Sequence, residues 1–501
     1  MWIAVGVAGR QLIGLVQLRQ TLEWVDQPQR DLQPNEVDGI AIHFVVPVLR
    51  EQAYVSATVS WFARLLRRLP CSSLSVVTTA REDREREHVL DVVVAAGVDP
   101  AALARIPQLS SAVQAALVSA ARPDHCINRS TAEAVLNRFP STAEVVAAEL
   151  AQSSYAGLSI RHVHYEGDGR KAAQVNHAVA GLPERSEVGY VAVYDVDSRP
   201  SPALIERTLA FAADQRATTS QWPAVLQQSA RFTTSGTHPQ GWQRAVCRGA
   251  ALLQTLWTLR REIPSFRRYA WAGRGSRSCA GMAAAARGLA QTVGHGLLVR
   301  VEVFRASGGL PVYTVLDDFP FGYRLSVDGI DVQPVPYTTL APGPEEVREL
   351  IAQGQRWFHN YLDYPRCAEN ARAQGHGTRW TRFVGLAVGG YRGATWLLRS
   401  PGIAASLGLL VGRAPWPART AAAVALGAGV VVPVWMLARA AGRTLSLPQL
   451  GREVGELVLA NLLSSAGPVA AIVERVRVGA PGGALSPKTS FRTAEPEAAT
   501  S

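Results

Sequence analysis

Short apolar segments rich in Val and Ile alternate with helical stretches through the first part of the chain, and this alternation constrains the fold most. The segments with the length and composition of buried strands are residues 40–48, 74–79, 158–165 and 188–196. The helical stretches between them are residues 51–69 and 171–180, and another begins after Pro202. Strands that alternate with helices predict an α/β fold, in which helices cover a parallel or mixed sheet. Ligands of such sheets bind beyond the carboxyl ends of the strands.

The other segments divide the chain further, because 501 residues suffice for a main domain with appendages. Residues 1–38 are an apolar segment followed by a polar, proline-bearing linker. Arg10 interrupts the apolar part, which leaves a membrane-contacting helix and a soluble one equally open. Residues 84–156 are alanine-rich and predict a helical insertion. Residues 479–501 are small, polar and proline-bearing, and we expect them to be disordered.

Residues 366–478 are expected to form a helical, membrane-associated region. Within them, residues 421–438 are uncharged, apolar, bracketed by two arginines and close to the length that crosses a bilayer. Residues 393–411 and 454–473 are weaker candidates. The net charge of +11 and the arginines crowded here favour contact with anionic lipids, and we expect no nucleic-acid partner. The alternative is a buried helical bundle in an alanine-rich protein.

An Asp-x-Asp motif follows the last of the expected strands. Residues 193–200 read VYDVDSRP, with Asp195 and Asp197 at the carboxyl edge of the strand. Side chains of a strand repeat with period two, so both carboxylates are expected on the same side. Two carboxylates there can hold a hard divalent cation that also binds a diphosphate. Asp-x-Asp alone is a weak signal, and its position after a strand strengthens it.

Two acids also stand together at 317 and 318, where residues 316–325 read LDDFPFGYRL. Paired acids at the start of a helix are often simple N-terminal capping groups. One of them could instead be a general base that faces a pocket. The sequence by itself favours the capping interpretation.

The most specific short motif is QGQRW at residues 353–357. The preceding GPEEVREL predicts a helix with Pro344 in its first turn. On that helix Gln353, Arg356 and Trp357 share one face, because they are three and four residues apart. The face offers an amide, a guanidinium suited to phosphate and an aromatic ring suited to a sugar. An ordinary amphipathic helix is the alternative.

In this order and spacing the three motifs resemble those of membrane-bound family-2 glycosyltransferases, which carry Asp-x-Asp, Thr-Glu-Asp and Gln-x-x-Arg-Trp. The segments VVPVLRE (45–51), KAAQVN (171–176) and GHGLLVR (294–300) are also similar to segments of that family. The resemblance implies a GT-A fold, a Rossmann-like mixed sheet covered by helices, over residues 39–365, with the helical C-terminal region embedded in the membrane.

The resemblance also implies a chemistry. Asp197, helped by Asp195, would bind Mg²⁺ or Mn²⁺ on the diphosphate of a nucleotide-sugar donor, expected to be UDP-linked. Arg356 would offset charge on the departing nucleoside diphosphate. Asp318 would be the general base of a single displacement that inverts the anomeric carbon. The implied localisation is the cell membrane, with the catalytic domain on the cytoplasmic side.

Further substrate-binding residues follow from the same resemblance: Glu51, Lys171, Asp195, His295, Asp317, Gln353, Arg356 and Trp357. Glu51 and Lys171 would lie in the donor half, although a helix-capping Glu and a surface Lys are equally open interpretations. Gln353 and Trp357 would line the acceptor site.

Two departures from the family pattern matter. Asp317 stands where the family has Glu, and VTTARED at 77–83 lacks the usual acidic turn after the second strand. Glu82 or Asp83 could replace that turn in recognising the nucleotide base. The missing turn is the support for one alternative, a non-catalytic membrane scaffold with a decayed transferase domain. The other alternative is a processive polysaccharide synthase, but so few apolar spans favour a lipid-linked or short saccharide acceptor.

Overall fold

The computed structural model describes most of the chain and separates it into two compact units. The described residues are 2–25, 40–99, 103, 109, 111–122, 125–183, 188–234, 241–274, 289–290, 292–294, 296–314 and 316–479. Unit 1 draws its described residues from 1–44, 183–194 and 200–479, and unit 2 draws them from 45–182 and 195–199. The predicted linker at 26–38 and the predicted disordered tail from 480 onward lie outside the described residues.

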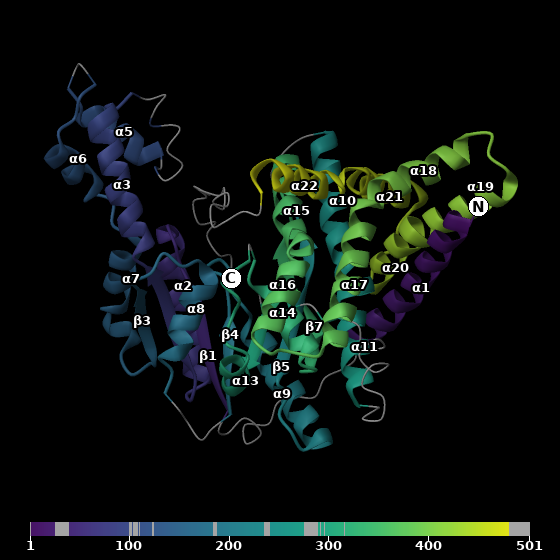
Figure 1. Cartoon of the computed structure of the whole chain (residues 1–501), viewed down its shortest axis with the longest axis horizontal. Helices are drawn as coiled ribbons and strands as arrows, with labels where there is room; N and C mark the ends of the chain where they lie inside the picture. The colour runs from purple at the N-terminus through teal and green to yellow at the C-terminus, as the bar shows by residue number, and fades with distance from the viewer. Residues whose placement is uncertain are drawn as a thin grey trace. The chain divides into compact units, whose positions relative to one another are not determined.

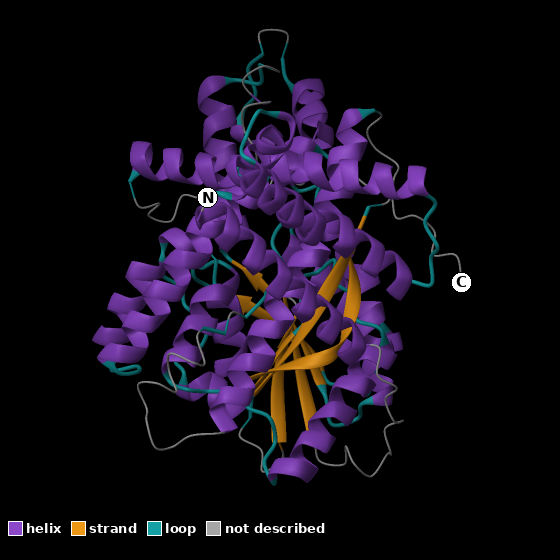
Figure 2. Ribbon diagram, turned by 90° about the vertical axis from the view of Figure 1, so that its right-hand side faces the viewer, coloured by secondary structure: helices purple, strands orange, loops and turns teal. Residues whose placement is uncertain are grey.

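A mixed sheet of seven strands runs through the chain (Figure 2), in the order β3-β2-β1-β4-β6-β5-β7. The pairs β2–β3 and β5–β7 are parallel, whereas β4–β6 and β5–β6 are antiparallel. The strands are β1 (Ile40–Pro47), β2 (Ser73–Thr79), β3 (Ile160–Tyr165), β4 (Val188–Val193), β5 (Val225–Thr233), β6 (Leu297–Arg300) and β7 (Val332–Pro342). The predicted fold class, a mixed sheet covered by helices, is confirmed.

Each of the four expected strands is present, with two differences that matter. The side chains of β1 and β4 are buried almost throughout, as the apolar runs predict. All six residues of β3 are only half-buried, so the prediction of a fully buried strand there is wrong, because β3 is an edge strand. β4 ends at Val193, two residues before Asp195.

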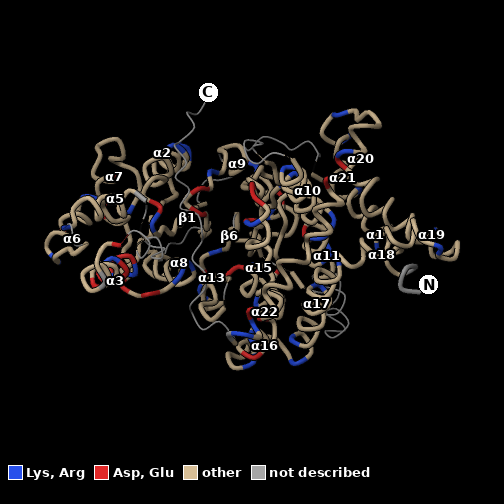
Figure 3. The backbone as a smooth tube through the Cα atoms, turned by 90° about the horizontal axis from the view of Figure 1, so that it is seen from above, with Lys and Arg blue, Asp and Glu red and all other residues tan. Residues whose placement is uncertain are grey.

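The described α-helices of unit 2 are α2 (Gln52–Arg68), α3 (Arg81–Ala96), α5 (Ser111–Ala120), α6 (Arg129–Leu136), α7 (Thr142–Leu150) and α8 (Lys171–Ala180). Several of these helices, among them α2, α7 and α8, lie beside strands of the same unit (Figure 1). The region 84–156 is helical in its described part, and α3, α5 and α6 share a small apolar core that includes Val93, Leu117 and Val135. Figure 3 shows acidic and basic residues close together along α3. The same helix contributes apolar side chains to this core.

Unit 1 contains the remaining helices. Before the QGQRW motif they are α1 (Trp2–Val25), α9 (Pro202–Thr219), α10 (Trp242–Trp257), the π-helix η3 (Thr258–Glu262), α11 (Ile263–Arg274), α13 (Val301–Ala306) and α14 (Asp318–Val327). From the motif onward they are α15 (Val347–Leu362), α16 (Tyr364–Ala373), α17 (Arg379–Leu397), α18 (Arg399–Val411), α19 (Trp416–Leu426), the π-helix η4 (Gly427–Val431), α20 (Val432–Ala440), α21 (Leu447–Leu463) and α22 (Ala466–Val478).

The start of α15 differs from the prediction. The helix begins at Val347 after an extended Glu346, so Pro344 lies before the helix and not in its first turn. The reason is that β7 pairing continues past the strand: the backbone N–H of Gly343 donates to the Thr233 carbonyl at 2.6 Å. The carboxylate of Glu349, in the first turn of α15, accepts a hydrogen bond from the Glu345 N–H at 2.9 Å and so ties the preceding segment to the helix.

Two helices at the C-terminal end are long and apolar enough to cross a membrane. One runs from Trp416 to Ala440, through α19, η4 and α20, and includes the predicted span 421–438. The other runs from Leu447 to Arg477, and α17 with α18 forms a third candidate, bent by 49°. Only 44% and 39% of the two apolar windows are buried, and Trp416 is 77% exposed. Apolar surface of this kind indicates membrane association.

Candidate functional site

Some of the predicted site residues belong to unit 2 and the others to unit 1. In unit 2, polar side chains lie in the loops and helices that follow β1 and β2 and in the short segment Asp195–Arg199. Lys171, the first residue of α8, has its Nζ 2.8 Å from Asp195 Oδ1, and both side chains are about one-third exposed or less. The structure therefore joins two predicted donor-site residues that are distant in sequence.

Asp195 and Asp197 do not follow the alternation of a strand. Because β4 ends at Val193, Asp195 lies in a loop and Asp197 in the turn that follows. The Ser198 N–H donates to the Asp195 carbonyl at 2.9 Å and closes this turn. Asp195 is half-buried and Asp197 is exposed. The period-two argument therefore does not apply to these two residues, because both lie beyond the end of the strand.

The two aspartates suit a divalent cation only together with other oxygen ligands. Among the described residues no group of three or more His, Cys, Asp or Glu is arranged to hold a metal ion. Mg²⁺ in phosphate-transfer sites is commonly bound by one or two carboxylates, with substrate phosphates and waters completing the shell. The exposed Asp197 and the half-buried Asp195 fit that arrangement.

Glu51 and Glu82 stand at the ends of β1 and β2. Glu51 precedes α2, and its carboxylate gives the helix no side-chain cap bond. Glu82 is buried, and its Oε1 accepts from Gln52 Nε2 at 2.9 Å and from the Thr142 N–H at 3.1 Å. Those bonds tie α2, α3 and α7 together, so Glu82 serves the fold and is a poor candidate for recognising a nucleotide base.

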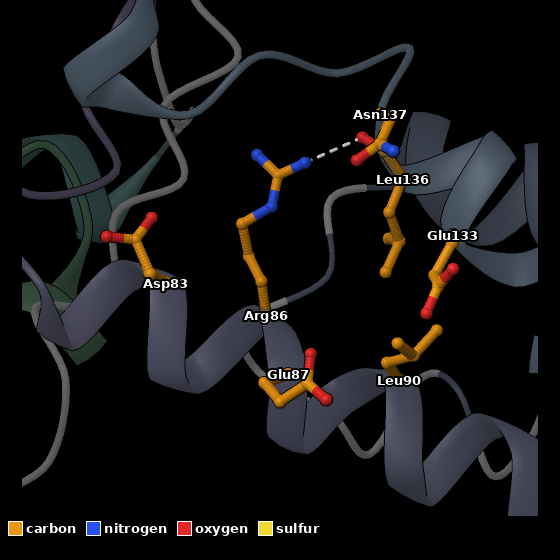
Figure 4. A pocket seen from close by; sticks show the side chains of 7 residues that line it. All are labelled: Asp83, Arg86, Glu87, Leu90, Glu133, Leu136 and Asn137. Carbon is orange, nitrogen blue, oxygen red and sulfur yellow. Dashed lines mark hydrogen bonds between the residues drawn. The ribbon is translucent and has the colours of Figure 1, made fainter.

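Asp83 lies one residue further and lines a surface pocket between α3 and α6 (Figure 4). The pocket is lined by Asp83, Arg86, Glu87, Leu90, Glu133, Leu136 and Asn137. Arg86 donates across it to the backbone carbonyls of Leu136 and Phe139 at 2.8 and 2.9 Å. Apart from Asp83, the lining includes none of the predicted substrate-binding or metal-binding residues, and the Arg86 guanidinium holds α3 to the loop after α6.

In unit 1 the acidic pair begins α14. Asp317 is the N-cap and its Oδ1 accepts from the Asp318 N–H at 3.1 Å, so Asp317 caps the helix as the capping interpretation expects. Asp318 Oδ1 accepts from the Phe319 N–H at 2.7 Å. The other oxygens differ: Asp317 Oδ2 is buried with no hydrogen-bond partner in the described structure.

Asp318 Oδ2 faces the glycine-bearing loop before β6. A Cβ added to Gly294 would lie 3.0 Å from this oxygen, so the loop leaves room at the carboxylate only because residue 294 has no side chain. Thr292 Oγ1 donates to the Asp318 carbonyl and ties the loop to α14. The neighbouring His295 lies outside the described residues.

β5 holds this loop in place through the side chain of Gln227 and the backbone of Gln228, contacts that the sequence did not predict. Gln227 Oε1 accepts from the Val293 N–H at 2.8 Å, and the Gln228 N–H donates to the Gly296 carbonyl at 2.9 Å. Both glutamines are fully buried. Two adjacent glutamines inside an apolar strand were the available signal, because buried amides need partners.

On α15 the three motif residues have different surroundings. Gln353 is half-buried, and its Oε1 accepts from Gln254 Nε2 on α10 at 2.7 Å. Trp357 is half-buried and Arg356 is exposed. The next face of the helix packs on α22, where Gln355 donates to Glu474 at 2.8 Å and His359 contacts the same carboxylate at 2.9 Å. Figure 1 shows α15 and α22 side by side.

Residues 244–438 match the model of the glycosyl transferase family group 2, a segment that holds the acidic pair and the QGQRW motif. No curated protein matches the chain.

The chain is also similar to solved structures at low identity. One is the mannosyltransferase PcManGT from Pyrobaculum calidifontis in complex with GDP-Man and Mn²⁺, at 14% identity and TM-score 0.42, over 94% of this chain and 99% of that one. Another is S. aureus TarS 1-349, at 10% identity and TM-score 0.32, over 86% and 91%. Its complex with UDP-GlcNAc gives 9% identity and TM-score 0.33, over 86% and 92%.

The fold is a mixed seven-stranded sheet with helices, and the predicted acids follow β4 and begin α14. The match over 244–438 is to the glycosyl transferase family group 2, the kind of family that the motifs resemble.

Proposed function

We propose that the protein is an inverting, metal-dependent transferase that moves a sugar from a nucleotide-diphosphate donor, UDP-linked by the resemblance, to a lipid-linked or saccharide acceptor. The observation that carries the proposal is the position of Asp318. Its Oδ2 faces the Gly294 loop from the first turn of α14, within the segment that matches the family. Asp318 is half-buried, so part of the residue is exposed.

In the proposed reaction the acceptor oxygen attacks the anomeric carbon from the face opposite the nucleoside diphosphate. Asp318 takes the hydroxyl proton as the new carbon–oxygen bond forms, and the diphosphate leaves with the electron pair of the broken bond. A single displacement inverts the anomeric carbon. Arg356 on α15 supplies a positive charge suited to a phosphate leaving group.

Asp195 and Asp197 would hold Mg²⁺ or Mn²⁺. When bound, the cation offsets the negative charge of the donor diphosphate. Lys171 forms an ion pair with Asp195 at 2.8 Å and would compete with the cation for that carboxylate. Glu51 and Lys171 would contact the donor, and Gln353 and Trp357 would line the acceptor site.

The proposed place of action is a membrane surface, with the catalytic domain on the cytoplasmic side. The support is the pair of apolar helices 416–440 and 447–477, together with exposed aromatic rings at Trp416 and Trp435. Trp at the ends of apolar helices is typical of membrane interfaces.

The test uses full-length protein in detergent with Mn²⁺ and a panel of nucleotide sugars. We expect one donor to release its nucleoside diphosphate, faster when the correct acceptor is present. The matched pair of variants is Asp318→Asn and Glu369→Gln, because Glu369 is exposed on α16 and outside the proposed site. Release by the Glu369→Gln protein only would support the proposal. No release with any donor would favour the non-catalytic scaffold.

A further inference from the structure

Four arginines from three helical elements of unit 1 converge in the apolar helical region. Arg10 lies on α1, Arg260 and Arg261 on the π-helix η3, and Arg399 at the start of α18. Their positive charges repel one another. Burial lowers the pKa of Arg260 to about 10, and the positive charges of Arg399 and Arg10 lower it further. Burial also lowers the pKa of Arg261 to about 10, followed by the charges of Arg10 and Arg260.

Arg260 is the structural centre of this cluster. Its Nη2 donates to the Gln11 carbonyl and side chain at 3.1 and 2.9 Å, and its Nη1 donates to the Gly429 carbonyl at 3.2 Å. The guanidinium lies against Gly14, where a Cβ would collide with it. Arg260 therefore joins η3 to α1 and to η4, and both of these π-helices contact α1 at this place. Single π-turns inside helices occur frequently at functional sites.

The other three arginines lack a negative partner. Within the described residues, none of Arg10, Arg261 and Arg399 forms an ion pair with a carboxylate, and Arg10 stacks on the Tyr391 ring at 5.3 Å. Arg10 Nε and Arg260 Nε are buried without hydrogen-bond partners in the described structure. The adjacent Glu262 does not offset the positive charge of the cluster, because its carboxyl group accepts a hydrogen bond from Ser229 of β5 at 2.6 Å.

Arg260 is buried, whereas Arg10, Arg261 and Arg399 are half-buried. Like charges held close together in apolar surroundings are costly unless an anion pairs with them. Guanidinium groups match phosphate oxygens in geometry and charge, and several together favour a group that carries more than one negative charge. Apolar side chains flank the cluster: Leu18, Leu259, Val430 and Val434 form a common core beside it, and Leu12, Ile13 and Val16 of α1 are exposed. A phosphate attached to an apolar chain would pair with the arginines through the phosphate and contact the apolar side chains through the chain.

We propose that Arg10, Arg261 and Arg399 bind the phosphate group of a lipid beside Arg260, where Arg260 joins η3 to α1 and η4. The site is independent of the sugar-transfer chemistry, and its test reads binding alone. The same phosphate chemistry could come from a free phosphate ion, so the experiment includes both sources.

The probes are phosphatidic acid, diacylglycerol and inorganic phosphate, added to the full-length protein in neutral detergent. Thermal unfolding, followed by tryptophan fluorescence, gives the apparent affinity of each. We expect phosphatidic acid to raise the unfolding temperature and diacylglycerol to leave it unchanged. An equal rise with inorganic phosphate would assign the site to the free ion. No rise with either phosphate probe would overturn the proposal.

The variant is Arg261→Gln/Arg399→Gln, which spares the bonds of Arg260. Its matched control is Arg413→Gln, since Arg413 is exposed beyond α18. The double variant should bind phosphatidic acid roughly tenfold or more weakly, because charge-assisted hydrogen bonds are lost. Without lipid it should unfold at the wild-type temperature or above it, because two like charges are removed. Equal loss of affinity in the control, or a less stable lipid-free double variant with normal affinity, would contradict the proposed site.

Discussion

Lys171 Nζ lies 2.8 Å from Asp195 Oδ1, so the chain already supplies one carboxylate of the Asp-x-Asp motif with a positive partner. Asp197, two residues on, is exposed in the turn. The two acids are thus unequal: one is fixed by a lysine and the other is open to a ligand. This asymmetry favours Asp197 as the principal metal ligand and Asp195 as its helper.

The first prediction concerns that inequality. Asp197→Ala should abolish turnover, and an excess of chelator should abolish the turnover of the wild-type protein, because the donor diphosphate would lose its counter-charge. The measurement is product formation as a function of Mn²⁺ concentration. Full activity in excess chelator would remove the metal from the mechanism.

Lys171→Met provides the comparison for this prediction. It removes a cation that competes for Asp195, so binding of Mn²⁺ measured without donor should become tighter. Weaker Mn²⁺ binding in this variant would mean that Lys171 supports the metal site and does not compete with it.

A second prediction concerns the space beside Asp318, the proposed general base. Gly294→Ala places a methyl group 3.0 Å from Asp318 Oδ2, closer than most such contacts. The carboxylate must shift by a few tenths of an ångström, and kcat should fall by roughly tenfold because the reacting groups lose their alignment. Donor KM should hold. The control is Gly390→Ala, where a Cβ meets nothing within 4 Å. Equal kcat values for the two variants would mean that Asp318 does not react there.

The local elements of this fold could be predicted from the sequence, whereas the long-range contacts could not. Helix α8 begins at Lys171 and ends at Ala180 as its apolar periodicity predicts, since a helix depends on neighbours three and four residues away. The start of α15 was misplaced because pairing of Gly343 with the distant Thr233 holds that segment extended. No local pattern announces such pairing.

The candidate site shows the same division. Asp318 could be proposed from its motif, but the contact with Gly294 depends on where the loop before β6 passes. The arginine cluster was beyond prediction for the same reason, because Arg10 and Arg260 meet only through the packing of α1 on η3.

A third prediction follows from a buried acid. Glu262 is enclosed beside β5, and burial raises its pKa from 4.5 to about 7. The folded protein therefore holds this proton when the unfolded chain has released it, so stability falls as the pH rises from 4.5 to 7 and then levels off. The loss is about 3 kcal/mol at most. Unfolding in detergent at pH 5 and pH 8 should show Glu262→Gln less sensitive to pH than the wild type. Equal sensitivity would mean that Glu262 ionises without cost.

A fourth prediction concerns the membrane. The full-length protein should float with vesicles and require detergent for extraction, because the helices 416–440 and 447–477 leave most of their apolar windows uncovered. Val424 and Val431 are each 37% exposed, so Val424→Asp/Val431→Asp should weaken flotation without disturbing the core. A detergent-free, monodisperse wild-type protein would favour the buried bundle.

The final prediction separates the two acids that begin α14. Asp318→Asn keeps the size of the side chain but cannot accept a proton, so transfer should fall by roughly 10²–10⁴-fold, as expected when a general base is lost. Donor affinity should be retained, because Asp195, Asp197 and Arg356 are unchanged. Asparagine caps a helix about as well as aspartate, so a purely capping role would leave Asp318→Asn nearly as active as the wild type. Asp317→Asn is the matched variant, since Asp317 is the N-cap next to Asp318 and its Oδ2 is buried without a partner in the described structure. The measurement is transfer rate beside donor affinity for both variants. A collapse confined to Asp317→Asn would move the base one residue back, to the N-cap itself.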